Sequence, residues 1–573
     1  MKKIRALFVL LVLLQTGSLL FAENNQKIIR LGSDVYSALT ALYLEQGLAP
    51  PSTSGPYSVE ELREYLARID RSTLSPAGLQ AYAYVETFLT HRVRASDDMG
   101  NFQFNTEPTV TIAGYAQTNP DAAPSQEPQW LQRPALVNIP LEVWLFNGFY
   151  ADLEPELLID RFEAQLPAGS APASYSFNPT NVPLSMAQVD FNIPYRAFMS
   201  LGGPHWNVDL GRFKLSWGNG VFGNLMLAPN SDFYDNLRFS TFWKNFKYTF
   251  VFISLPPYWP GFVPPYPTSL PSGWASDQAT TSGIPDPYKA FFGHRLEFRI
   301  GNRVTTAISE AVVYGGAYPS LTDLNPLMIW HNLFVPWMAK SLVTAEVSVN
   351  PFKWLELYGQ LAVFNFRNFE YSEYTSATTI PNALGYFGGA KGSFPLGKGY
   401  LTAAFQWTKT DPWLYIGGND SSANGNYNQP WLSYSMSEFY TSNVLGTKTL
   451  VEWPLGWQYG PDTIVWNASV AYQVYGTYKA GAELRIEQQG INTIDTAFRL
   501  GPTATGMVAV QDTPFPIDTQ VVHLFGSWLI GRILSADWTV GGDIFFVNVQ
   551  NINHVSGDKS FNVQFVGSLS LTY

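Results

Sequence analysis

Apolar and polar residues alternate one by one through long stretches of the chain after residue 105, and this period of two constrains the fold most. Leu296, Phe298 and Ile300 alternate with charged residues, and the same pattern recurs over 343–349, 355–363 and 482–487. Successive side chains of a β-strand point to opposite faces, so each stretch predicts a strand with one apolar and one polar face.

Composition distinguishes between the β-structures that alternate in this way. Charged residues make up only 14% of the chain and aromatic residues 15%, whereas soluble domains carry about 25% charged residues. A soluble sandwich would alternate too, but its water-exposed face would raise the charge. The sequence therefore predicts an all-β transmembrane barrel, apolar toward lipid and polar toward its lumen.

The N-terminus has the features of an export signal. Lys2, Lys3 and Arg5 precede an apolar core over 6–14, and the small residue Ala22 ends the segment. We expect residues 1–22 to be a signal peptide of the Sec pathway. The alternative is an anchor helix, but the apolar core is shorter than the ~20 residues of a membrane span. The expected location is the outer membrane of a Gram-negative-type envelope.

The far end of the sequence fits the same location. Counting back by twos from Tyr573 gives apolar residues or glycine as far as Phe561, with mostly polar residues between them. Such a strand spans a bilayer when tilted, and we expect the barrel assembly machinery to recognise it through Tyr573. A soluble β-protein could end this way by chance.

Short connections alternate with long ones. The short connections lie near 244–245, 301–302, 350–351, 397–399, 476–477 and 535–537, and the long ones near 255–290, 315–341, 367–384, 411–446 and 488–518. Outer-membrane barrels have short periplasmic turns and longer extracellular loops. We expect about 18 antiparallel strands over 105–573, with 150–200 the least readable stretch.

Residues 23–104 follow a helical pattern instead. Ser33, Ser58 and Ser75-Pro76 are helix-start signals, and apolar residues follow each at helical spacing, among them Leu39, Leu66, Leu79 and Val85. Three short helices are marginal alone, so we expect a small periplasmic bundle that plugs the barrel. A free-standing helical module is the alternative.

Two of the long loops, 255–290 and 411–446, combine aromatic rings with amide or carboxylate groups. Aromatic rings stack on the C–H faces of sugars while Asn, Asp and Gln bond hydroxyl groups. The alternative is that these rings pack loop against loop. The candidate glycan-binding residues are Trp259, Tyr266, Trp274, Trp413, Tyr427 and Trp431.

Other function classes lack support in the sequence. A net charge of −11 makes nucleic acid a poor partner. The chain has no cysteine, and its histidines show no zinc-type spacing, so we expect no metal, no cofactor and no catalysis. Six carboxylates at alternating positions are interpreted as lumenal and paired with arginines: Glu297, Glu310, Glu346, Glu356, Glu483 and Glu487.

Several short segments resemble the capsule assembly Wzi family. Leu210-Gly211-Arg212, Trp217-Gly218-Asn219-Gly220 and Gly223-Asn224-Leu225 are similar to one of its motifs. Later blocks similar to the family contain His294-Arg295, Ser309-Glu310 and Leu324-Asn325-Pro326. The resemblance covers about 30–365; the Pro-rich 255–290 loop departs from it, and no glycan-selecting loop motif transfers.

The resemblance implies an outer-membrane barrel of about 18 strands with a periplasmic helical plug, acting as a lectin for exported capsular polysaccharide. The motif residues are interpreted as architectural rather than ligand-binding, and Arg212 as an inward charge if its strand turns it to the lumen. The motif residues are Gly211, Arg212, Trp217, Gly218, Gly220, Gly223, Arg295, Glu310, Asn325 and Pro326.

The sequence favours the first of three functions, and the other two are its alternatives. The first is a non-catalytic barrel that binds or anchors surface or capsular polysaccharide, with outer-membrane lipid around it. The second is a porin-like channel for small solutes, and the third is an outer-membrane hydrolase.

Overall fold

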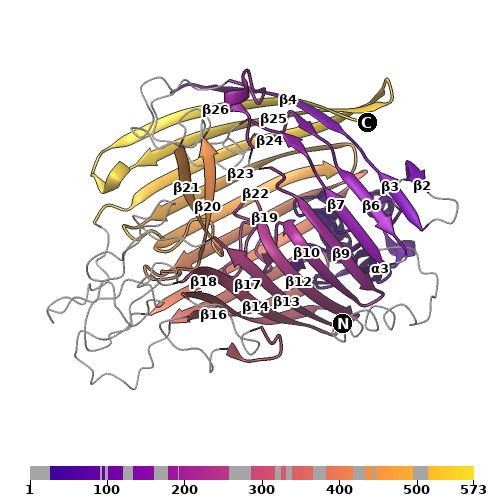
Figure 1. Ribbon diagram of the computed structural model, residues 1–573, viewed down its shortest axis with the longest axis horizontal. Coiled ribbons are helices and arrows are strands. Elements are labelled where there is room, and N and C mark those ends of the chain that lie inside the picture. The colour runs from indigo at the N-terminus through magenta and orange to yellow at the C-terminus, as the bar shows by residue number, and fades with distance from the viewer. Residues whose placement is uncertain are drawn as a thin grey trace, which may run out of the picture.

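Antiparallel strands make up most of the chain in the computed structural model, and they pair side by side into one closed wall (Figure 1). The structure describes residues 26–90, 93–96, 101–119, 133–146, 148–159, 179–191, 193–256, 286–316, 324–330, 339–365, 382–416, 433–442, 447–494 and 514–573. The expected signal peptide therefore lies outside the described residues.

Three strands of the wall are interrupted but keep one register. β3 (Phe102–Asn105) and β4 (Thr109–Gln117) pair with β6 (Leu141–Leu145) and β5 (Val137–Asn138) along one line. β6 and β5 pair in the same way with β7 (Phe149–Leu153) and β8 (Glu156–Leu157). Each pair of short strands is thus one wall strand with a short break.

Fifteen continuous strands complete the ring, and β26 closes it by pairing with β4 from Thr109↔Thr572 to Gln117↔Gln564. Among the described residues, three interrupted strands and fifteen continuous ones give the 18 strands that the sequence predicts, so the predicted fold is confirmed. The continuous strands are β9 (Ala197–Gly203), β10 (Trp206–Phe213), β12 (Tyr234–Trp243), β13 (Phe246–Leu255), β14 (Asp286–Ile300), β15 (Val304–Gly316), β16 (Ala339–Phe352), β17 (Leu355–Asn365), β18 (Ala383–Leu396), β19 (Gly399–Thr410), β22 (Thr463–Val474), β23 (Tyr478–Gln489), β24 (Ile517–Ile533), β25 (Ala536–Gln550) and β26 (Lys559–Thr572).

The two faces of the wall differ as the alternation predicts. On β14, Leu296, Phe298 and Ile300 are exposed, while Arg295 and Glu297 are at most 1% exposed. On β26, Phe561 and Phe565 are exposed while Asn562 and Gln564 are buried. The outer face is therefore an apolar belt and the inner face is polar, which suits a barrel surrounded by lipid.

Short turns lie at one end of the barrel and the long connections at the other. The turns after β12, β14, β18, β22 and β24 lie where the sequence predicts them. The turn expected at 350–351 lies instead at Lys353–Trp354, because β16 continues to Phe352 through an irregularity in its pairing. Trp243, Trp354 and Trp528 are exposed near this end, as in the aromatic girdle at a membrane surface.

Three α-helices lie at the same end as the short turns: α2 (Asp34–Gln46), α3 (Val59–Leu66) and α4 (Pro76–Glu86). The side chains of Ser33, Ser58 and Ser75 cap them as N-cap residues. The Trp354 amide in a turn donates to the Leu44 carbonyl at 2.7 Å, so the helices rest on the turns. Among the described residues, no helix is long and apolar enough to cross a membrane.

The core of this bundle matches most of the expected residues. Leu39, Leu66 and Val85 are at most 2% exposed, but Leu79 is 43% exposed. The buried face of α4 contains the small residues Ala77 and Ala81 instead of Leu79. The prediction for Leu79 is wrong because small residues let α4 pack closely and rotate Leu79 outward.

Candidate functional site: a filled lumen beneath the surface loops

The connection between β10 and β12, residues 214–233, folds into the barrel; we call it the inner loop. Its apolar residues Trp217, Leu225 and Leu227 are fully buried. The Asn219 side-chain amide donates to Ser348 Oγ of β16 at 3.0 Å, and the Leu225 amide donates to Gln360 Oε1 of β17 at 2.8 Å. Polar side chains of the inner wall therefore hold the inner loop in the lumen.

Glycines of the inner loop allow its chain to fold back on itself. Gly218 has φ 139°, and a Cβ there would lie 2.2 Å from Asn224 Oδ1. A Cβ on Gly220 would lie 2.0 Å from the Gly223 carbonyl oxygen, and one on Gly223 would meet the Trp457 ring at 2.8 Å. These contacts support the architectural interpretation of the motif glycines.

The inner loop meets the N-terminal part of the chain inside the barrel. The segment between α2 and α3 forms β1 (Ser54–Gly55), which pairs with β11 (Ser216–Trp217) of the inner loop. The Gly218 amide also donates to the Thr53 carbonyl at 2.8 Å. An obstruction contributed by two distant segments thus runs from the turn end into the lumen.

Buried ion pairs join the N-terminal segment to the wall. Lys247 of β13 pairs with Glu61 of α3, and both side chains are at most 1% exposed. Arg295 of β14 pairs with Glu297 at 2.8 Å and also with Glu346, while its guanidinium donates to Thr53 Oγ1. Removing one partner of such a pair leaves an uncompensated buried charge, so these contacts fix the helices in place.

Tyrosine hydroxyls extend the same network. Burial raises the pKa of Tyr65 well above 10, and the nearby Glu61 carboxylate raises it further. The phenol therefore remains protonated and donates its hydrogen bond to Glu61. Burial also raises the pKa of Tyr57, whose hydroxyl donates to the Ser52 carbonyl at 2.6 Å.

Described residues of a second connection, which joins β19 to β22, cover the inner loop from the side opposite the short turns. The Tyr415 hydroxyl donates to the Leu225 carbonyl at 2.7 Å, and the Tyr434 hydroxyl donates to the Met226 carbonyl at 2.9 Å. The two tyrosine rings stack 5.5 Å apart. The lumen here contains an apolar core.

The same connection carries a hairpin of β20 (Ser435–Ser442) and β21 (Thr447–Pro454) that is separate from the wall. Buried Lys289 of β14 donates to the Ser435 carbonyl at 2.8 Å. The Ser435 hydroxyl donates in turn to Glu452. The base of the hairpin is thus tied to the inner wall.

Of the six aromatic candidates for glycan binding, the structure describes only Trp413. This side chain is 6% exposed and belongs to the apolar core of the lumen, so protein covers both faces of its ring. Trp413 acts in packing and does not offer a stacking surface for sugar. The other five candidates, Trp259, Tyr266, Trp274, Tyr427 and Trp431, lie outside the described residues.

Two charged residues of the family-like motifs face outward, contrary to expectation. Arg212 shares a face with exposed Leu210 and binds Asp235 through two hydrogen bonds of 2.9 and 3.0 Å. Glu310 shares a face with exposed Ile308 and binds His294 at 3.1 Å. Arg212 is therefore not turned to the lumen, and the interpretation of Glu310 as a lumenal carboxylate is wrong.

The remaining motif residues have structural contacts. Gly211 has φ 138°, and a Cβ there would lie 2.4 Å from the Ala197 carbonyl oxygen of β9. The Asn325 side chain accepts a hydrogen bond from the Leu327 amide at 3.1 Å. The Pro326 carbonyl accepts hydrogen bonds from Tyr248 and His294.

The lumen is filled unevenly around its circumference. The inner faces of β14 to β18 are mostly buried under the inner loop and the N-terminal segment. On β23 and β25, by contrast, the inward side chains of Glu483 and Asp543 are 40% and 31% exposed. Both contact His523, whose ring stacks on Phe545 at 4.2 Å. Among the described residues, a polar gap therefore remains along one side of the lumen.

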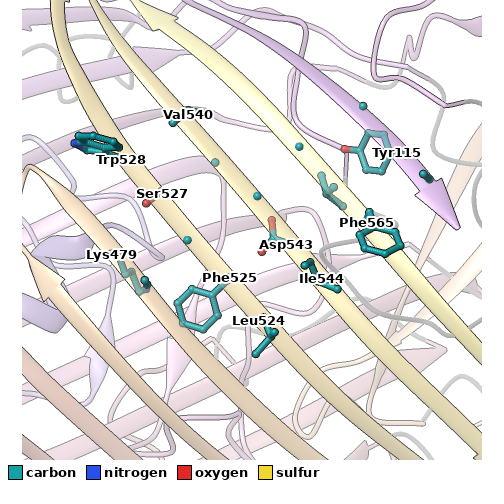
Figure 2. A pocket seen from close by; sticks show the side chains of 18 of the residues that line it. Tyr115, Lys479, Leu524, Phe525, Ser527, Trp528, Val540, Asp543, Ile544 and Phe565 are labelled. Carbon is teal, nitrogen blue, oxygen red and sulfur yellow. The ribbon is translucent and has the colours of Figure 1, made fainter.

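A cavity of about 1140 Å³ lies on the wall formed by β23 to β26 and β4 (Figure 2). Gly526, Gly542, Gly567 and Gly114 pair in one row across four strands and form its floor. Figure 2 shows Leu524, Ile544 and Phe565 side by side at one edge and Trp528 near the other. The glycine row and these apolar side chains belong to the outer face, but the lining also includes the polar residues Tyr115, Lys479, Ser527 and Asp543.

Known catalytic or metal-binding arrangements are not evident in the described part of the chain. No group of three or more His, Asp and Glu side chains there could hold a metal ion. Glu297 and Glu346 are bound by Arg295 instead of being placed as a free acid and base.

An 18-stranded wall with an apolar belt, a polar inner face, short turns at one end and long connections at the other defines an outer-membrane β-barrel. Comparison with solved structures supports the assignment to the outer-membrane β-barrels. The chain is similar to Wzi, described as an outer membrane protein involved in group 1 capsule assembly in Escherichia coli and as a carbohydrate-binding β-barrel. The TM-score is 0.54 at 12% identity, covering 95% of this chain and 98% of that one.

Other outer-membrane proteins show weaker similarity at 8% identity. OpdP of Pseudomonas aeruginosa matches with a TM-score of 0.39, covering 82% of this chain and 91% of that one. The channel DcaP of Acinetobacter baumannii matches with 0.33, covering 84% and 100%. No family model matches the sequence, and no curated protein does.

Proposed function

We propose that this outer-membrane barrel binds polysaccharide at the cell surface through its long loops, without catalysis and without an open pore. The observation that carries the proposal is the obstruction of the lumen, in which Ser54 pairs with Trp217. Because an open porin needs a continuous aqueous channel, a filled barrel is better suited to display loops. The fold shared with a barrel described as carbohydrate-binding supports the same role.

The proposed contacts are the aromatic residues of the two long loops, with Trp413 removed from the set. Stacking on one sugar is weak, so affinity for a polymer must come from several linked contacts that raise the effective concentration. We therefore expect long polysaccharide chains to bind measurably and isolated monosaccharides to bind poorly.

The test is pull-down of purified surface polysaccharide by the wild type and by a variant with Trp259→Ala, Trp274→Ala and Trp431→Ala. We expect the triple variant to lose most of the binding. A matched control carries Trp243→Ala, Trp354→Ala and Trp528→Ala, which remove three exposed rings at the turn end. If the wild type and the loop variant retained equal amounts of polysaccharide, the proposal would be contradicted.

The alternative function is a narrow channel, and the polar gap beside β23 to β25 favours it. Glu483 and Asp543 there are partly exposed inside the wall. Conductance in planar bilayers separates the two functions. A full-length protein that conducts like an open porin would replace the binding proposal with the channel.

A further inference from the structure

Residues 324–330, between β15 and β16, lie against the outer face of the barrel; we call this segment the strap. We propose that the strap is embedded in the membrane, fixed to the wall by a buried polar cluster, with an apolar crest that contacts the acyl chains of lipid. This inference concerns the outer wall and is independent of glycan binding by the loops.

The position of the strap follows from strand register. Phe250, His294 and Glu310 are paired neighbours on β13, β14 and β15. His294 lies two residues before Leu296, which is exposed on the outer face. The cluster beneath the strap therefore belongs to the lipid-facing side of the wall.

The cluster also lies at the depth of the hydrocarbon. Phe250 follows the turn residue Asn245 by five positions. A tilted strand rises roughly 2.5 Å per residue, which places His294 roughly 12 Å above the turn, near the middle of an apolar belt about 25 Å tall. A polar pair open to lipid at this depth would be costly.

The strap shields this pair. The side chains of His294 and Glu310 are only 17% and 8% exposed. The Trp330 ring stacks on the His294 ring at 4.5 Å, and the Trp330 amide donates to Glu310 Oε2 at 3.2 Å. Trp330 itself is fully buried against Phe250 and Phe292.

Hydrogen bonds hold the other half of the strap. The Pro326 carbonyl accepts from the Tyr248 hydroxyl and lies 3.2 Å from His294 Nδ1. Both ring nitrogens of His294 thus face acceptors, the Pro326 carbonyl and the Glu310 carboxylate. The His294 ring therefore joins the strap to the side chain of Glu310 on β15.

The opposite side of the strap is apolar and uncovered. Leu324, Leu327 and Ile329 are 37%, 80% and 64% exposed. These side chains project from a segment that rests on the lipid-facing wall of an outer-membrane barrel. Hydrocarbon is the surrounding medium there, so lipid acyl chains are the occupant to which we assign this crest.

The experiment labels the crest with a nitroxide. The chain has no cysteine, so Leu327→Cys creates a unique labelling site at a position exposed enough to leave folding intact. Collision with dissolved O₂ and with a water-soluble Ni(II) chelate is measured in phospholipid vesicles. Leu296→Cys on the lipid-facing wall and Lys398→Cys in a turn are the matched controls.

We expect the Leu327→Cys label to collide more often with O₂ than with the chelate, as the Leu296→Cys label does. A chelate-dominated response like that of Lys398→Cys would overturn the proposal by placing the crest in water. A label that neither reagent reaches would overturn lipid as the occupant and indicate a protein partner or a second copy.

A second substitution tests whether the contact between Glu310 and His294 holds the strap on the wall. Glu310→Gln keeps the side-chain shape but removes the negative charge opposite His294. We expect the strap to detach in this variant and the nitroxide on Leu327→Cys to move faster. The lines of its electron paramagnetic resonance spectrum should then narrow. An unchanged electron paramagnetic resonance spectrum would show that the contact between His294 and Glu310 does not hold the strap.

Discussion

Ser54 and Trp217 are paired strand neighbours inside the barrel, although 162 residues separate them in the sequence. Both residues are at most 1% exposed. Their contact joins an N-terminal segment that enters from the turn end to a loop that folds inward from the opposite direction. Two structural parts therefore fill the side of the lumen opposite the polar gap, and neither accounts for this filling alone.

This arrangement predicts a graded effect of deletions on conductance. The full-length protein should conduct weakly in planar bilayers. Deleting residues 23–100 should raise the conductance only in part, because residues 214–233 remain held by Gln360 and Ser348. Replacing 214–233 by a short turn in the same deletion should open the pore fully. A full opening by the first deletion alone would contradict the role of the inner loop.

The lipid-facing register predicts the effect of a charge at Phe565. Phe565→Arg places a charge on the outer face of β26, where it should cost about 2–4 kcal/mol near the bilayer midplane. Ser568→Arg on the inner face of the same strand is the control and should cost much less. Urea titration of folding into lipid vesicles measures both. Equal costs would mean that the assigned faces are wrong.

The Glu61–Lys247 pair predicts strong coupling between the helices and the wall. Both groups are buried, so Glu61→Gln should destabilise the protein by about 3–5 kcal/mol. The exposed pair Arg71–Glu86, at 4.0 Å, is the comparison, and Glu86→Gln should cost less than about 1 kcal/mol. Denaturant midpoints of the two variants provide the measurement. Similar midpoints would show that water reaches the Glu61 site.

Gly218 offers a test of the inner-loop geometry. Gly218→Ala adds a Cβ at 2.2 Å from Asn224 Oδ1 at a residue with φ 139°. We expect a loss of about 1–3 kcal/mol from backbone strain, with additional loss from the clash. Gly388→Ala on β18 is the control because nothing lies within 4 Å of its added Cβ. Comparable heat-modifiability of the two variants would contradict the folded-back loop.

The wall of the barrel could be predicted from the sequence because its signal is local. Each strand carries its own alternation, so Leu296 and Arg295 indicate opposite faces without knowledge of any partner. The turns follow from the residues between alternating stretches. The contents of the lumen could not be predicted in this way, because contacts such as Ser54 with Trp217 join segments far apart in sequence.

The outward direction of Arg212 and Glu310 had a signal in the sequence. Arg212 has the same parity as Leu210 and Val208, and Glu310 has the same parity as Ile308 and Val312. Parity alone places both charges on the apolar face. Each charge is accommodated there by a partner, Asp235 for Arg212 and His294 for Glu310, and the strap also covers Glu310.

For Trp413, composition could not distinguish between two uses of an aromatic ring. A tryptophan beside amides and carboxylates suits both sugar stacking and loop packing. The decision depends on whether Leu225 and Trp457 lie close enough to cover the ring, and that depends on the inner loop. Burial of Trp413 was therefore not readable from its own neighbours in sequence.

The pairing of β26 with β4 has a consequence for the order of assembly. Gln117 and Gln564 belong to strands separated by most of the chain, so this seam carries the largest loop-closure cost in the wall. The N-terminal segment contacts the hairpin of β6 and β7, because Lys27 pairs with Glu142 of β6 at 2.7 Å. This hairpin lies early in the chain. The helices can therefore attach to the growing sheet before the seam forms, and closing the seam then encloses them without any need to thread them through a finished pore.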